Sequence, residues 1–232
     1  MGHLAPQSCC NSTLRMTAVE AHRWAQVAMQ RGTAAYAEWG SGGSTEALAW
    51  HSRHVAHRMR GVAIDSSQQW LDALRQRSPA IRDAEGAGAL RLAAADVGPV
   101  RDWGVPVDWD ARPPAVQRAQ ALRYVAAPAL ATLAPFDAMF VDGRFRAACA
   151  LHALLLLKPN GTTLIHDFFE PGETTARIRR EGYKVVLPWY HVSRVGRGTL
   201  AEGRPRAHPS TWPPEVKQRH ARAFNAALHD WK

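Results

Sequence analysis

Five acidic residues recur along the chain, each at the end of a short apolar run that predicts a buried β-strand. They are Glu38, Asp65, Asp96, Asp142 and Asp167. In an open parallel sheet the carboxyl ends of the strands meet at one edge, and ligands bind beyond that edge. We therefore expect these carboxylates to gather at one site, where they can bind ligand hydroxyl groups, a cation or a proton.

A glycine-rich segment, Gly40-Ser41-Gly42-Gly43-Ser44, separates the first apolar run from a helical pattern. Glycine permits positive φ and close approach of backbone amides to a ligand, and the following helix offers unpaired N–H groups. We expect Ser44 to cap that helix. A dinucleotide fingerprint needs a further glycine at the position of Thr45. Glu38, just ahead of the segment, would repel a pyrophosphate but suits a cationic amino acid or a ribose.

Asp65 ends the second apolar run, about twenty residues after Gly43, which is the spacing of a carboxylate that binds ribose hydroxyl groups. The two oxygens of one carboxylate match the two hydroxyl groups of a 1,2-diol. Together with the glycine-rich segment, this acid predicts a nucleoside ligand.

The segment from Glu38 to Gly42 resembles motif I, E/D-x-G-x-G, of the class I S-adenosylmethionine-dependent methyltransferases. In that family the acid and the glycine turn hold the methionine end of the cofactor. The resemblance also implies that Asp96 and Val97, after the third strand, bracket the adenine. The cofactor contacts that we expect are Glu38, Gly40, Ser41, Gly42, Gly43, Ser44, Asp65, Ser66, Asp96, Val97 and Asp142.

Two further segments, Val141-Asp142-Gly143-Arg144-Phe145-Arg146 and Leu156 to Asp167, look similar to a group of poorly characterised methyltransferase-like proteins. With motif I, the resemblance covers residues 14–195; it implies the fold but gives no substrate. Catechol-type O-methyltransferases place acidic ligands for a divalent ion at the positions of Asp142 and Asp167, which implies Mg²⁺ as a possible second cofactor. The match is partial, because His166-Asp167 replaces the Asp-Asn pair of that family.

Four residues of these segments are candidates for catalysis: Asp142, Arg144, His166 and Asp167. His166 could act as the general base, since the unperturbed pKa of histidine lies close to neutrality. Arg144 could bind a carboxylate or phosphate on the acceptor. The other interpretation of Asp142 and Asp167 is that they only orient the substrate or accept backbone hydrogen bonds.

Alternating apolar runs and helical patterns predict an α/β domain with a doubly wound, mostly parallel sheet and helices on both faces, as in the Rossmann-like methyltransferase fold. We expect an antiparallel pair of strands to close the sheet, at 183–187 and 191–195, after a polar helix at 171–180. The other predicted strands are 34–37, 61–65, 89–95, 136–141 and 162–165, and the other predicted helices are 14–31, 45–59, 67–76, 115–133 and 147–157, with a turn at 158–161.

The chain divides by composition into three parts. Residues 1–13 are polar and predict a disordered leader, residues 14–197 form the methyltransferase-like domain, and residues 198–232 read as a linker and a C-terminal helix. The linker prediction rests on the Gly, Pro and Arg content of 198–214. The helix is expected from Pro214 onward.

The 232 residues carry a formal charge of +9, which favours anionic partners and leaves nucleic acid as a possible one. Three cysteines, Cys9, Cys10 and Cys149, form neither a disulfide framework nor a zinc motif and suit a reducing compartment. No apolar run reaches the roughly 18 residues that span a bilayer, so we expect a soluble, intracellular and cytoplasmic protein with no membrane partner. The acid-free leader leaves organelle import open, and the oligomeric state is not indicated.

The leading functional hypothesis is an S-adenosylmethionine-dependent methyltransferase, a transferase that acts on a small-molecule acceptor at an oxygen. The sequence lacks an Asn/Asp-Pro-Pro-aromatic tetrapeptide, which argues against methylation of an exocyclic base amine. The alternatives are an RNA or protein methyltransferase that uses the basic surface, and a methyltransferase fold that serves as a non-catalytic binding module.

Overall fold

A seven-stranded sheet forms the centre of the computed structural model, which describes residues 15–29, 33–55, 59–172 and 176–229. The strand order is β3-β2-β1-β6-β7-β9-β8. The first five strands in this order are parallel, and β9 runs antiparallel to both β7 and β8. The strands are β1 (Ala35–Trp39), β2 (Arg60–Asp65), β3 (Leu90–Ala94), β6 (Phe136–Val141), β7 (Leu157–Ile165), β8 (Tyr190–Arg194) and β9 (Ala201–Pro205), and a separate small hairpin contains β4 (Val100–Arg101) and β5 (Val105–Pro106).

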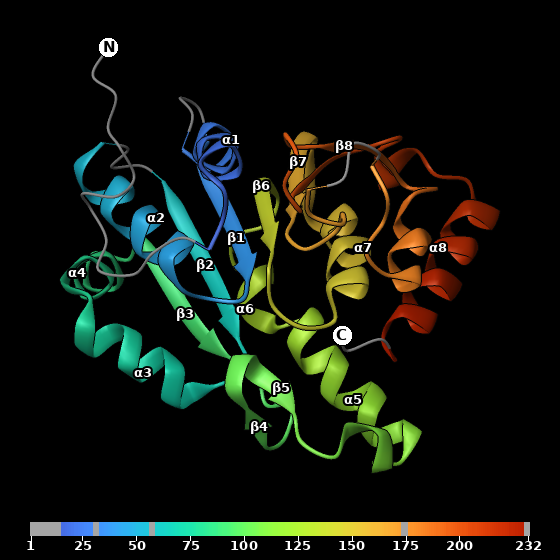
Figure 1. Cartoon of the computed structure of the whole chain (residues 1–232), viewed down its shortest axis with the longest axis horizontal. Coiled ribbons are helices and arrows are strands. Elements are labelled where there is room, and N and C mark those ends of the chain that lie inside the picture. Colours follow the sequence, from blue (N-terminus) through green and yellow to red (C-terminus); the bar gives the residue numbers. More distant parts are fainter. Residues whose placement is uncertain (1–14, 30–32, 56–58, 173–175, 230–232) are drawn as a thin grey trace.

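Helices cover both faces of the sheet (Figure 1), so the predicted doubly wound α/β fold is confirmed. The buried apolar residues of the strands divide between two hydrophobic cores: Tyr36 and Phe140 belong to one, and Ala37 and Met139 belong to the other. One core lies under α1 (Ala18–Ala28), α2 (Gly43–His54), α3 (Gln68–Arg77) and α4 (Pro79–Gly86); the other lies under α5 (Pro114–Val125), α6 (Pro128–Ala131), α7 (Arg146–Leu156) and α8 (Pro214–Ala227).

Local sequence signals explain where several helices begin. Thr17 and Glu20 form a reciprocal capping box at the start of α1. Ser67 accepts the backbone N–H of Trp70 and so caps α3. The sequence prediction missed α4, which starts at a Ser-Pro pair inside a segment that reads as a polar connection.

Four predicted elements differ from the structure. The helix expected over 115–133 is two helices, because Pro128 starts the short α6. The turn expected at 158–161 lies inside β7, where pairing with β6 is irregular. The described part of 171–180 contains no helix; its Ile178 pairs with Phe169 in an isolated β-bridge. The strand expected at 183–187 is replaced by a 3₁₀-helix, Glu181–Val186, whereas the strand expected at 191–195 is confirmed as β8.

The linker prediction for 198–214 is wrong, because this segment supplies β9, which lies between β7 and β8 in the sheet. The Gly and Arg residues of β9 make it look like a linker in the sequence, although the first three residues of the strand are buried. The C-terminal helix is confirmed as α8, which packs against α7. Residues 1–13, the predicted leader, lie outside the described residues.

Cys149 is buried in the core on α7, as its apolar neighbours predict.

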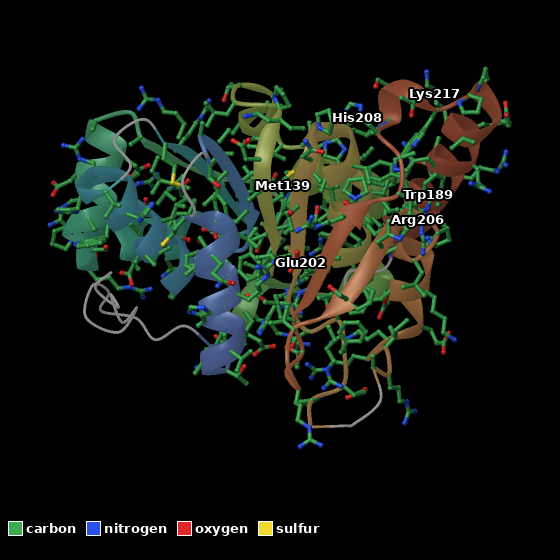
Figure 2. All side chains as sticks on the ribbon, turned by 90° about the horizontal axis from the view of Figure 1, so that it is seen from above. Met139, Trp189, Glu202, Arg206, His208 and Lys217 are labelled. Carbon is green, nitrogen blue, oxygen red and sulfur yellow. The ribbon has the colours of Figure 1, made fainter. Side chains whose placement is uncertain are left out.

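In Figure 2, Met139 lies in the middle of the sheet, whereas Lys217 marks α8 at the end of the molecule. Within the described ranges, none of the helices has the length and apolarity that crossing a membrane requires.

Candidate functional site

The acids predicted to gather at one edge of the sheet do follow the carboxyl ends of parallel strands. Glu38 lies near the end of β1, Asp65 is the last residue of β2, and Asp96, Asp142 and Asp167 follow β3, β6 and β7. Because these five strands are parallel, all five residues belong to the same edge. Their side chains, however, take up three different environments.

The carboxylate of Asp65 binds the glycine turn directly. Its Oδ2 accepts hydrogen bonds from the backbone N–H of Ser41 at 3.0 Å and from the Ser41 hydroxyl at 2.8 Å. Its Oδ1 accepts the backbone N–H of Ser67 at 3.1 Å. Burial raises the pKa of Asp65, and the hydrogen bonds from Ser41 oppose that effect. The residue spacing in the sequence therefore corresponds to a real contact between the acid and the turn.

Gly42 leaves open space in front of the turn. A Cβ atom at this position would meet no other atom within 4 Å. Its N–H donates to the Thr45 hydroxyl at 2.9 Å, and α2 begins at the next residue. Ser44 therefore lies inside the helix, and the prediction that it caps α2 is wrong. The open side of the turn is a place where a ligand can approach the backbone, as a nucleoside cofactor requires.

Glu38 lies beneath the turn and is fully buried. Its carboxyl group accepts hydrogen bonds from the hydroxyl groups of Tyr36, at 3.0 Å, and Thr45. Burial raises the pKa of Glu38 to about 7. Because Thr45 also accepts the N–H of Gly42, Glu38 supports the turn from below and is not exposed to a ligand.

Three other predicted cofactor contacts, Asp96, Val97 and Ser66, lie in different surroundings. Asp96 is largely exposed and forms an ion pair with Arg123 at 3.2 Å. Val97 is fully buried in the hydrophobic core. The hydroxyl of Ser66 lies where a Cβ atom on Gly104 would be, so the loop after β4 packs closely against it.

Asp142, His166 and Asp167 form a second cluster at the ends of β6 and β7. Nδ1 of His166 lies 2.9 Å from Oδ1 of Asp142. Burial is the largest single effect on the pKa of His166 and lowers it, but the hydrogen bond to Asp142 and the negative charges of Asp142 and Asp167 together outweigh burial, so the pKa lies above the usual value. This carboxylate–imidazole pair is an arrangement that orients a histidine for proton transfer.

Arg146, the first residue of α7, lies between the two carboxylates. Its guanidinium group is 3.2 Å from Oδ1 of Asp142 and 2.7 Å from Oδ2 of Asp167. It also donates to the backbone carbonyl groups of Asp142, Gly143 and His166. Arg179 pairs with the other oxygen of Asp167 at 2.5 Å. Both acids are therefore neutralised by side chains of the chain itself.

This arrangement does not fit the predicted magnesium site. One ligand atom from each of Asp142, His166 and Asp167 lies within 4.8 Å of the others, a spacing that a metal could use. The buried guanidinium group of Arg146, however, is already bonded to both carboxylates, and a divalent cation at the same point would be repelled. The guanidinium group of Arg146 thus supplies the positive charge between Asp142 and Asp167.

Sequence reasoning missed two residues of the site. Arg146 has a signal that could have revealed it, because it follows Asp142 by four residues, the spacing of a helical ion pair. In the sequence, Thr45 is conspicuous only because it stands where a dinucleotide fingerprint has a glycine. In the structure its hydroxyl group links Glu38 to Gly42. Arg144, which was predicted, lies beside this cluster, and its backbone N–H donates to the Tyr124 hydroxyl at 3.4 Å.

Comparisons with known proteins agree with this fold. The sequence matches no family model and no curated protein. Among solved structures, a methyltransferase-like protein from Silicibacter pomeroyi DSS-3 is 23% identical with a TM-score of 0.64, covering 92% of this chain and 97% of that one. Cofactor-bound Rv0187 from MTB is 16% identical with a TM-score of 0.53, covering 86% of this chain and 84% of that one. At these identities the likeness shows the fold: the chain has the Rossmann-like architecture of the methyltransferase-like protein.

Proposed function

We propose that the chain is an S-adenosylmethionine-dependent methyltransferase that methylates a small molecule at an oxygen. The observation that carries this proposal is the pair of hydrogen bonds from Ser41 to Asp65, beside the open face of Gly42. A ribose-binding acid and an approachable glycine turn thus adjoin at the edge where ligands of such sheets bind. The fold shared with a methyltransferase-like protein supports the same function. The resemblance to the group with the Val141–Arg146 run remains a prediction.

The glycine turn and the residues that bond to it would hold the cofactor. The turn from Gly40 to Ser44 and the first N–H groups of α2 would bind the methionine part. Asp65 would bind the ribose, with a ribose hydroxyl replacing the Ser41 hydroxyl on Oδ2. Glu38 and Thr45 would keep the turn in shape. The bound cofactor supplies an activated methyl group, so the main task of the protein is alignment of the acceptor.

The residues of the second cluster would act on the acceptor. The pair formed by His166 and Asp142 would take the proton of an attacking hydroxyl group, and their hydrogen bond supports methylation of oxygen. Arg146 and Asp167 would hold that pair in place through their own ion pairs. The proposed reaction needs no metal ion, because Arg146 occupies the position between the carboxylates.

Isothermal titration with S-adenosylmethionine and S-adenosylhomocysteine tests this proposal. Gly42→Val places a branched side chain in the open space in front of the turn, so it should fold normally and lose at least about tenfold in affinity. Gly86→Val is the matched control, since a Cβ atom at Gly86 also meets nothing within 4 Å, but on α4. Absence of binding by the folded wild-type chain, or equal binding by Gly42→Val, would overturn the proposal.

The alternative of an RNA or protein methyltransferase draws support from the formal charge of +9. Binding to RNA that weakens steeply with rising salt would favour it, whereas salt-independent binding of small phenols favours the small-molecule acceptor. The other alternative, a non-catalytic binding module, predicts cofactor binding without methyl transfer to any acceptor class.

A further inference from the structure

Arg144 carries a buried hydrogen-bond donor for which the described residues offer no acceptor. Its Nε lies out of contact with solvent and makes no hydrogen bond to any residue that the structure describes. Burial, followed by repulsion from the Arg146 guanidinium group, lowers the pKa of Arg144. Buried polar groups in folded proteins are nearly always hydrogen-bonded, so an exception marks a place where an acceptor belongs.

The carboxylates near Arg144 are engaged elsewhere. Asp142 is bonded to His166 and Arg146, and Asp167 is bonded to Arg146 and Arg179. Arg180 adds further positive charge close to Arg144. The neighbourhood therefore holds more guanidinium groups than carboxylates, and an anion from outside the chain would balance it.

Tyr183 provides a second donor without an acceptor in the same neighbourhood. Its hydroxyl group is buried and donates to no acceptor in the described part of the chain. It lies beside Arg146 and Arg180, which are also charged neighbours of Arg144, and arginine side chains can only donate. The arginine cluster around Arg146 therefore has two buried donors, Arg144 Nε and the Tyr183 hydroxyl, that no acceptor among the described residues satisfies.

Arg144 also adjoins the proposed cofactor turn. The preceding residue, Gly143, packs so closely on Gly40 that a Cβ atom on Gly40 would lie 2.7 Å from the Gly143 nitrogen. We propose that the methyl acceptor carries an oxyanion, a carboxylate or a phosphate, that binds the guanidinium group of Arg144. This inference rests on the proposed function, since it names the class of molecule that the enzyme methylates.

Titration of the full chain, labelled with ¹⁵N-arginine and saturated with S-adenosylhomocysteine, tests the inference by NMR and calorimetry. The probes are inorganic phosphate, benzoate and, as the uncharged counterpart of benzoate, benzamide. We expect one of the two anions, but not benzamide, to bind and to shift the Arg144 Nε–H resonance. Arg144→Gln should weaken anion binding by about tenfold or more, as for other charge-assisted bonds. Arg144→Lys should keep part of the affinity, because it keeps the charge.

Arg91→Gln is the control, because it removes the same charge from an exposed position on the edge strand β3. A preference for phosphate assigns a phosphorylated acceptor, and a preference for benzoate assigns a carboxylate. The inference is overturned if neither anion binds, or if Arg144→Gln binds them as tightly as Arg91→Gln. Should Arg144→Gln not fold, the Nε–H shift of the wild-type chain decides. If the wild-type chain binds S-adenosylhomocysteine but neither anion, this inference alone is refuted, whereas anion binding by a wild-type chain that does not bind S-adenosylhomocysteine refutes the proposed function alone.

Discussion

Gly40 and Gly143 lie in backbone contact, which joins the turn after β1 to the turn after β6. A Cβ atom on Gly40 would lie 2.7 Å from the nitrogen of Gly143, and Gly40 has a φ of 89°. A Cβ atom on Gly143 would overlap the buried hydroxyl group of Tyr124. In the proposed function the first turn would hold the cofactor, and the second carries Asp142 and Arg144, so this contact would set the distance between cofactor and acceptor.

Gly143→Ala should therefore destabilise the fold by about 3 kcal/mol, because the added methyl group has no space. Tyr124→Phe removes the hydroxyl group that the methyl would meet. The double variant should lose less stability than the sum of the two single variants, measured as free energies of unfolding in urea. Gly86→Ala is the control and should change little, since its Cβ atom enters open space. Strict additivity of the two substitutions would contradict the predicted overlap.

The strand ends could be predicted from the sequence because apolar runs and their terminal acids are local signals. Asp65 and Asp142 stand where the alternation of strands and helices places them. The direction of the Glu38 side chain could not be predicted. Both faces of β1 are covered by helices, so Tyr36 and Ala37 are equally buried and the sequence pattern does not distinguish the two sides of the strand.

The four-residue spacing from Asp142 indicates one contact of Arg146, but its second contact, with Asp167, depends on geometry that no spacing reveals. Phe145 adopts a left-handed conformation with φ of 54°, and α7 begins at the next residue. That local bend gives Arg146 contact with both carboxylates and leaves Arg144 without one. Likewise, β9 forms only because β7 and β8 provide partners on either side, and its own residues resemble a linker. In both cases the structure depends on contacts between residues that are far apart in the sequence.

Asp65→Asn should weaken the binding of S-adenosylhomocysteine by about tenfold or more, because hydrogen bonds to a charged acceptor are the stronger ones. Asparagine keeps the shape and can still accept the N–H of Ser41, so folding should be retained. Calorimetric titration gives the affinity, and urea unfolding checks the fold. Asp83→Asn, at an exposed position on α4, should bind like the wild-type chain. Unchanged affinity of Asp65→Asn would remove the ribose-binding role.

Removal of metal ions should leave the protein unaffected, because Arg146 supplies the positive charge between Asp142 and Asp167. Treatment with a chelator should change neither the melting temperature nor the affinity for S-adenosylhomocysteine. Arg146→Met leaves two carboxylates near each other and should destabilise by about 3–5 kcal/mol. Added Mn²⁺, observed by electron paramagnetic resonance, should bind this variant and restore part of its stability. Stoichiometric Mn²⁺ binding to the wild-type chain, lost in Asp167→Asn, would show that the metal site exists after all.

Acid should weaken the docking of α8 through His152 on α7. Its ring lies 5.8 Å from that of Phe224, and burial, followed by repulsion from His220, lowers its pKa to about 4. In the unfolded chain histidine takes up a proton near pH 6.5, so the unfolded state binds it first as the pH falls. This group therefore contributes stability above pH 6.5 that is lost between pH 6.5 and 4, by up to about 3 kcal/mol.

The free energy of unfolding in urea at several pH values measures this loss, and tryptophan fluorescence reports on α8. Trp189 and Trp212 pack 5.2 Å apart, and both contact His220 of that helix. His152→Gln cannot titrate, so its stability should fall less between pH 6.5 and 4 than that of the wild-type chain. His191→Gln, at an exposed position on β8, should keep the wild-type pH dependence. Equal slopes for wild-type and His152→Gln would mean that other groups cause the acid sensitivity.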